Sequence, residues 1–106
     1  MGDDIMRRVF ICSPFRGDMV ANVELARKLC LLACLNDAAP FAPHLIYPQF
    51  LRDVGAERDA GINAGLAFLR CCDELWCPMG IEPTEGMKYE IAYAKVLALP
   101  IVEVVI

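Results

Sequence analysis

The segment best suited to bind an anion spans residues 12–18 and reads Cys-Ser-Pro-Phe-Arg-Gly-Asp. Ser13 offers a hydroxyl, Arg16 offers a forked set of charged donors, and Gly17 lets the backbone approach a ligand closely. The segment leads into a helical stretch, and backbone amides near a helix N-terminus attract anions. The alternative is an ordinary strand-to-helix turn with a surface arginine, because the segment is neither a P-loop nor a Gly-x-Gly-x-x-Gly motif. The candidate ligand-binding residues of this loop are Ser13, Pro14, Phe15, Arg16, Gly17 and Asp18.

A second candidate for chemistry is Glu90, which lies in a helical pattern of apolar residues. The buried face of that pattern is formed by residues at helical spacing, Met87, Ile91, Ala94 and Ala98. Glu90 falls on the margin of this face, where a carboxylate costs free energy unless something uses it. Carboxylates act as nucleophiles towards the anomeric carbons of sugars. The alternative is a glutamate that extends to solvent or pairs with Arg16.

The residues around Glu90 complete this second candidate site. Thr84 suits the N-cap position, and Gly86 leaves space above the first helical turn. Tyr89 is adjacent to Glu90 and could orient it. We therefore expect catalytic roles for Glu90 and Tyr89, and ligand-binding roles for Thr84, Glu85, Gly86 and Met87.

His44 is the only histidine and follows Pro43 at the mouth of an expected strand. It could contact a ligand, act as an acid or cap a loop. The six cysteines include no Cys-x-x-Cys pair, which favours free, buried thiols in a reducing compartment. A metal site built from Cys12, Cys77 and His44 is the alternative, but its spacing matches no known zinc pattern. We expect neither a metal nor a cofactor.

Strands and helices must alternate to position these groups. Strands are expected at 7–12, 40–43, 73–77 and 100–106, helices at 20–35, 57–70 and 84–98, and an irregular segment at 44–54. Such alternation implies right-handed crossovers and an α/β fold with a parallel sheet covered by helices on both faces. The expected strand order is 2-1-3-4, a small flavodoxin-like arrangement in a single domain spanning residues 1–106. Ligands of such sheets bind beside the carboxyl end of the first strand.

The composition indicates which class of protein and which kinds of partner to expect. The net charge is −4 and no basic run is present, so a nucleic-acid polymer is not an expected partner. No apolar run approaches the length of a membrane span, and the N-terminal residues lack the pattern of a signal peptide, so we expect a cytoplasmic protein. Apolar residues make up 58% of the chain, and mean hydropathy is +0.45. That richness in a short chain predicts a homodimer or larger homo-oligomer.

Three segments resemble an uncharacterised bacterial and phage family of small proteins that is similar to nucleoside 2-deoxyribosyltransferases and nucleotide N-glycosidases. They are Val-Phe-Ile-Cys-Ser-Pro-Phe-Arg-Gly-Asp at 9–18, Ala-Pro-His-Leu-Ile-Tyr-Pro-Gln-Phe-Leu at 42–51, and Cys-Asp-Glu-Leu-Trp at 72–76 followed by Glu-Gly-Met-Lys-Tyr-Glu-Ile at 85–91. The resemblance to the small-protein family spans nearly the whole chain. The link to the enzymes rests on the two candidate loops and the order of elements.

The resemblance implies a nucleoside or nucleotide ligand and a set of roles. Glu90 would be the nucleophile of the segment Gly-Met-Lys-Tyr-Glu, attacking the anomeric carbon before water or a second base resolves the glycosyl-enzyme. Ser13, Arg16 and Gly17 would receive a 5′-phosphate. Thr84 would match a hydroxyl residue that, in dimers of those enzymes, can complete a neighbour's phosphate site.

The sequence also departs from the enzymes. Gly65 stands where they carry an aspartate that helps protonate the departing base, and general acid help is worth about 10²–10⁴-fold. Asp59, His44 or Asp18 could substitute. The tyrosine often found in their first strand is absent, with Val9 and Phe10 in that region.

Three functions therefore remain open. The leading hypothesis is an N-glycosidase or 2-deoxyribosyltransferase-like enzyme. The second is a non-catalytic module that binds a nucleotide or an ADP-ribose-like ligand, and the third is a subunit-interaction protein with a vestigial cleft.

Overall fold

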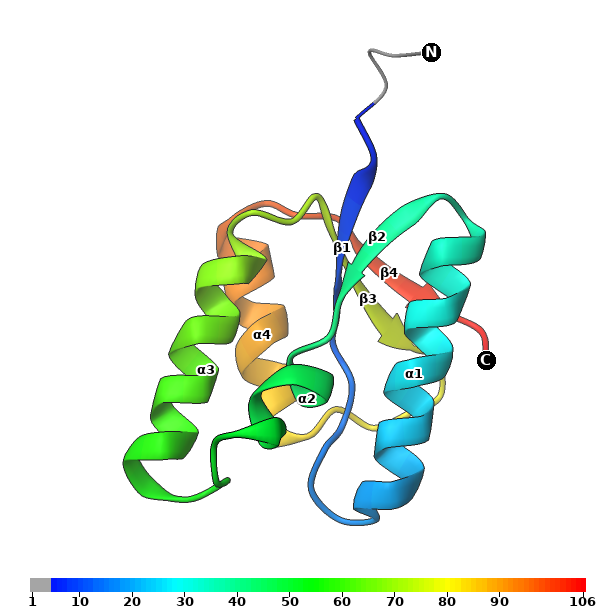
Figure 1. Ribbon diagram of the computed structural model, residues 1–106. Coiled ribbons are helices and arrows are strands. Elements are labelled where there is room, and N and C mark those ends of the chain that lie inside the picture. The colour runs from blue at the N-terminus through cyan, green and yellow to red at the C-terminus, as the bar shows by residue number, and fades with distance from the viewer. Residues whose placement is uncertain (1–4) are drawn as a thin grey trace.

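Strands and helices alternate along the chain, and every strand of the sheet runs parallel to its neighbours. The computed structural model describes residues 5–106. Its elements, in chain order, are β1 (Arg7–Ile11), α1 (Met19–Leu35), β2 (Ala38–Phe41), α2 (Pro43–Ile46), η1 (Tyr47–Gln49), α3 (Gly55–Leu69), β3 (Glu74–Pro78), α4 (Glu85–Val96) and β4 (Ile101–Val104). The sheet has the order β2-β1-β3-β4, so the predicted α/β fold and strand order are confirmed (Figure 1).

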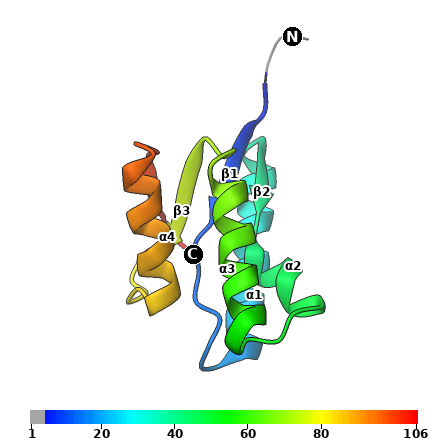
Figure 2. The same cartoon turned by 90° about the vertical axis from the view of Figure 1, so that its left-hand side faces the viewer.

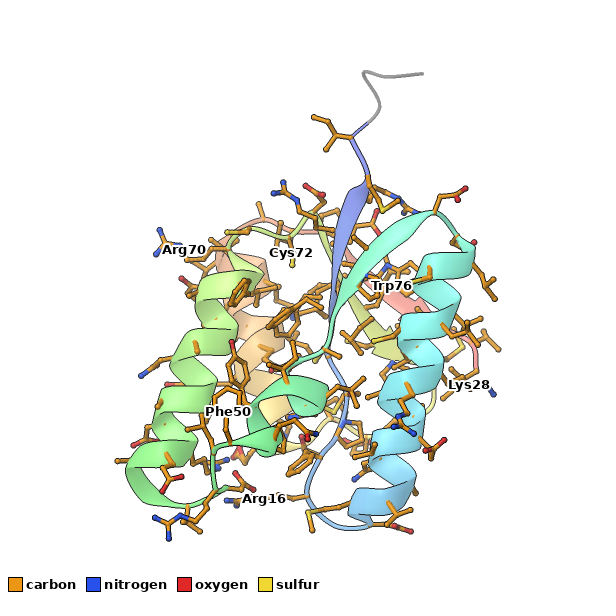
Figure 3. The ribbon with its side chains drawn as sticks, viewed as in Figure 1. Arg16, Lys28, Phe50, Arg70, Cys72 and Trp76 are labelled. Carbon is orange, nitrogen blue, oxygen red and sulfur yellow. The ribbon has the colours of Figure 1, made fainter. Side chains whose placement is uncertain are left out.

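Helices cover the sheet from both sides because side chains of a strand alternate between its faces. Val9 and Ile11 of β1 face α1, whereas Phe10 and Cys12 face α3 and α4. Figure 1 shows the layers edge-on, with α3 and α4 on one side of the strands and α1 on the other, and Figure 2 looks onto the face that α3 and α4 cover. Trp76 of β3 is buried on the α1 side, where it lies between the sheet and that helix (Figure 3).

The second strand lies earlier in the chain than the predicted range 40–43. Asp37 has a φ of 57°, so the chain turns sharply after α1 and Ala38 already pairs with Arg7 of β1. Pro40 is tolerated because β2 is an edge strand. Pro43 does not extend the strand.

The prediction of an irregular segment at 44–54 was wrong for its first half. Residues 43–49 form the short helices α2 and η1, and a proline lies at the start of each, Pro43 and Pro48. Proline has its φ already fixed near the helical value, and its missing N–H is not needed in a first turn. The remaining elements match their predicted ranges to within two residues at each end.

The carboxyl ends of the strands meet at the lower edge of the sheet in Figure 1, beside the β1–α1 loop and the start of α4. This is the edge at which open α/β sheets bind ligands. None of the helices within residues 5–106 combines the length and hydropathy needed to span a membrane.

Candidate functional site

Two side chains at the start of α1 hold the β1–α1 loop in place. Asp18 is the N-cap, and its carboxylate accepts a hydrogen bond from the Ala21 amide at 3.1 Å. The Asn22 side-chain amide donates to the carbonyl oxygens of Phe15 and Arg16, each at 3.0 Å. Asp18 therefore caps α1, and Asn22 fixes the backbone of the loop from which Phe15 and Arg16 project.

Ser13, at the start of the same loop, carries a buried hydroxyl. The residue is 1% exposed, and its Oγ has no hydrogen-bond partner within residues 5–106. Buried hydroxyls in native proteins are nearly always bonded, so an unmatched one costs free energy. Gly17 has a φ of 100°, a conformation that favours glycine, and it makes the turn into α1 possible.

Glu90 lies on α4 with one oxygen sealed from solvent. Its Oε1 is buried and lacks a hydrogen-bond partner among the described residues. Burial raises the pKa of the Glu90 carboxyl from its ordinary 4.5 to about 8, partly opposed by its interaction with the Cys12 thiol. At neutral pH the carboxyl is therefore mostly protonated, and it is the most strongly perturbed acid of the cavity.

Cys12 and Cys77 lie against Glu90 at the ends of β1 and β3. The Cys12 Sγ donates a weak hydrogen bond to the carbonyl of Met87 at 3.7 Å. Contact with Cys77, together with burial and the nearby Glu90, raises the pKa of the Cys12 thiol far above its ordinary value, so it stays protonated. Within residues 5–106, no three His, Cys, Asp or Glu side chains are grouped so that they could hold a metal ion. The alternative site of Cys12, Cys77 and His44 does not form.

His44 lies in α2 and stacks on Phe15 of the β1–α1 loop. The ring centroids are 5.1 Å apart and the planes are inclined by 24°. Burial lowers the pKa of His44, against the opposing effects of a hydrogen bond with the Ser13 backbone and of the Asp53 charge. The imidazole is therefore neutral at pH 7 and forms part of an aromatic wall.

Arg16 is bound to Asp53 and not to Glu90. Its Nε forms an ion pair with the Asp53 carboxylate, and its Nη2 donates to the Asp53 carbonyl at 3.0 Å. Arg58 of α3 approaches the same carboxylate, with Nε 3.3 Å from Oδ1. Figure 3 shows Arg16 at the lower edge of the molecule, below α2. The alternative in which Glu90 is neutralised by Arg16 does not occur.

A cavity of about 1120 Å³ connects these groups. It brings together eight of the predicted site residues, from both candidate loops and α2: Phe15, Arg16, His44, Thr84, Glu85, Gly86, Tyr89 and Glu90. Five others do not line it: Ser13, Pro14, Gly17, Asp18 and Met87. The two loops and the acid therefore open into one hollow.

The predicted residues of α4 take different positions around this hollow. Thr84 is the N-cap, accepting a hydrogen bond from the Met87 amide at 3.3 Å, as its sequence position indicated. Met87 itself is buried in the core between the sheet and α4. Tyr89 is 64% exposed, and no hydrogen bond within residues 5–106 ties it to Glu90.

Gly65 is buried on the face of α3 that packs against α2 and η1. A Cβ at this position would lie 3.7 Å from the Pro43 Cβ and 4.0 Å from the Tyr47 Cε2. These are ordinary van der Waals contacts, so a Cβ would fit at this position, and Gly65 itself lines the cavity. Of the three substitute acids considered, His44 and Asp59 line the cavity and Asp18 does not.

Several residues of the site could not be identified from the sequence: Asn22, which holds the β1–α1 loop, and the cavity-lining residues Tyr47, Asp53 and Arg58. In the sequence, the stretch from η1 to the first turn of α3 resembles an exposed polar loop. Its charged residues are of the kind that any such loop carries. The charges Asp53 and Arg58 are five residues apart, and only the tertiary fold brings Arg16 to them.

Comparisons with known proteins add the family and two likenesses in fold. The 2-deoxyribosyltransferase from Leishmania mexicana is 18% identical with a TM-score of 0.69, over 93% of this chain and 64% of that one. The 2-deoxyribosyltransferase from the psychrotolerant bacterium Bacillus psychrosaccharolyticus is 14% identical with a TM-score of 0.66, and the match covers 89% of this chain and 69% of that protein. The chain thus spans less than two thirds of the Leishmania protein, and these likenesses show a common fold.

No curated protein matches the sequence. The model of one family, described as a domain of unknown function (DUF7768), matches residues 7–104. The chain belongs to that family, and the resemblance to a small family with the deoxyribosyltransferase fold is confirmed.

The raised pKa of Glu90 predicts a pH-dependent stability. Because the folded protein retains a proton that the unfolded chain releases above its ordinary pKa of 4.5, the free energy of unfolding should fall as pH rises from 4.5 to about 8. Glu90→Gln removes this titration. Between pH 5 and pH 8, urea unfolding should show the wild type losing roughly 3–5 kcal/mol relative to Glu90→Gln.

The matched control is Glu82→Gln, at an exposed glutamate in the loop before α4 and outside the cavity lining. Its stability should follow the wild type at every pH. Parallel curves for the wild type and Glu90→Gln would contradict the burial of an ionisable carboxyl.

Proposed function

We propose that this DUF7768 family member cleaves or exchanges the N-glycosidic bond of a small-molecule nucleoside or nucleotide, with Glu90 as the nucleophile. The observation that carries the proposal is the Glu90 carboxyl, with one buried and unpartnered oxygen, in a cavity that Phe15 and Arg16 also line. The common fold with two 2-deoxyribosyltransferases supports it. A cavity of about 1120 Å³ is large enough for a ligand of nucleotide size.

The reaction proceeds in two displacements. The Glu90 carboxylate attacks C1′ of the sugar, the C1′–N bond breaks, and its electron pair leaves with the base, which takes up a proton. Water then attacks C1′ of the glycosyl ester, releasing the free sugar and the carboxylate and giving its proton to solvent. A second base in place of water gives a new nucleoside, which is the transfer reaction.

The nucleophile must be ionised, and burial opposes this in the free protein. A cation beside Glu90 would ionise it, but the arginines of the cavity are engaged at its mouth, Arg16 and Arg58 with Asp53, and Arg52 with Glu57. The titratable groups that influence Glu90 are Cys12, through a hydrogen bond, and Cys77, through its charge, and neither supplies a positive charge. Such an environment holds a reactive, poorly solvated carboxylate once the proton has left.

Release of free base is the direct test of this activity. Purified protein incubated with a panel of 2′-deoxynucleosides and their 5′-monophosphates should liberate base, measured by reversed-phase chromatography. Glu90→Gln keeps the shape of the side chain and removes the nucleophile, so it should lower the rate by about 10³-fold or more.

Glu82→Gln again serves as the control and should retain the wild-type rate. If no substrate yields base, or if Glu90→Gln releases it as fast as the wild type, Glu90 is not a nucleophile.

The pH profile tests the protonation state that the mechanism requires. The value of kcat/KM should rise about tenfold per pH unit below 8 and level off above it, because only ionised Glu90 attacks. Base released by Glu90→Gln gives the background at each pH. A profile that falls as pH rises through 8 would instead assign the reactive role to the protonated carboxyl.

The second candidate function is a non-catalytic module that binds a nucleotide or an ADP-ribose-like ligand in the same cavity. It is favoured by Gly65, which lines the cavity at the position of the enzymes' acid and carries no carboxylate. A pure binding module should be stabilised by its ligand, by about 2.7 kcal/mol at 100 times Kd, without producing base. Thermal unfolding with each compound, followed by chromatography of the same sample, separates the two functions.

A further inference from the structure

One carboxylate is held by two arginines at the mouth of the cavity. The Asp53 Oδ2 pairs with Nε of Arg16, and its Oδ1 lies 3.3 Å from Nε of Arg58. The Asp53 carbonyl also accepts a hydrogen bond from Nη2 of Arg16 at 3.0 Å. The two guanidinium groups come from different parts of the chain, the β1–α1 loop and the first turns of α3, and they meet only at this anion.

Two convergent guanidinium groups form a site for an anion. Their planar donors suit the oxygens of carboxylates and phosphates alike, and without an anion between them their positive charges would repel each other. Asp53 fills this position with a single negative charge. A phosphate monoester would bring nearly two charges and three acceptor oxygens to the same donors.

The Asp53 bridge is suited to exchange because it is exposed. The Arg16 and Asp53 side chains are 61% and 39% exposed, and ion pairs at such exposed positions contribute little to stability. Asp53 lies between η1 and α3, in a stretch outside the regular elements, so it can withdraw without disturbing the sheet. Its removal would leave Arg16 and Arg58 facing the cavity that Glu90 lines.

We propose that Arg16 and Arg58 form an anion site which Asp53 occupies as an internal competitor, and that the phosphate of a nucleoside 5′-monophosphate displaces this carboxylate. The identity of the ligand as a nucleotide rests on the proposed function, whereas the anion site does not. Asp53 is then a specificity-determining residue: unphosphorylated nucleosides leave the bridge closed, and monophosphates open it.

Removal of the competing charge should strengthen phosphate binding. Asp53→Asn keeps the size of the side chain, and calorimetric titration should show affinity for inorganic phosphate and for 2′-deoxyadenosine 5′-monophosphate increasing about five- to tenfold. Affinity for 2′-deoxyadenosine should change less than twofold. Adding Arg58→Gln to Asp53→Asn should abolish the gain, because the site then has one guanidinium.

The matched control is Glu57→Gln, which removes one negative charge from the same cavity lining but from the pair with Arg52. It should alter phosphate affinity less than twofold. An equal gain in Glu57→Gln, or no gain in Asp53→Asn with its thermal unfolding unchanged, would overturn the proposal. Binding is measured without turnover, so phosphate affinity gained by Asp53→Asn in a protein that releases no base would refute only the glycosidase function.

Discussion

Burial of the Glu90 carboxyl without a cation is the constraint around which the cavity is arranged. An ionised carboxylate at this position would lose its solvation, and the fold supplies no opposite charge to replace it. The proton therefore stays on at neutral pH, and the side chain is held as a neutral acid between α4 and the ends of β1 and β3. The sheet makes this possible, because Cys12 and Cys77 lie near each other at its carboxyl edge and neither brings a positive charge to the acid.

Charge is separated by depth within the cavity. The arginines and their acidic partners lie at the mouth, where water screens them, and each guanidinium is already engaged. The titratable groups that act on Glu90 are the cysteines Cys12 and Cys77, whereas the neutral imidazole of His44, stacked on Phe15, feels the charge of Asp53. The same cavity therefore offers arginines and an aromatic pair to a ligand that carries both an anionic group and a ring.

The architecture could be predicted from the sequence because its signals are local. The runs Val9 to Ile11 and Leu75 to Cys77 are short and apolar, as buried parallel strands are, and Thr84 is an N-cap at the start of an apolar pattern. The position of Glu90 on the margin of a buried face followed from helical periodicity alone. These features need no knowledge of the distant parts of the chain.

Other features of the site depend on contacts far apart in sequence. Pro43 was expected at the end of a strand and Pro48 within an irregular segment, but in the folded chain each lies at the start of a short helical turn. Arg16 and Asp53 are 37 residues apart, and no periodicity links them. Met87 was expected at the ligand because it lies between Gly86 and Glu90 in the sequence, but it lies in the core, on the buried face that its helical spacing also indicated.

Gly65 bears on the proposed reaction, because it stands where the enzymes that the sequence resembles carry an aspartate. A Cβ at Gly61 would meet Leu51 Cδ1 at 3.4 Å, and one at Gly65 would lie 3.7 Å from the Pro43 Cβ, so α2 and the chain that follows it lie against this helix. The contacts at position 65 are ordinary van der Waals contacts, and both Gly65 and Tyr47 line the cavity. The missing acid is therefore a matter of residue type and not of space for a Cβ. Under the proposed function, bases that leave readily without full protonation are the expected substrates, because general acid help contributes least where the leaving group is already stable.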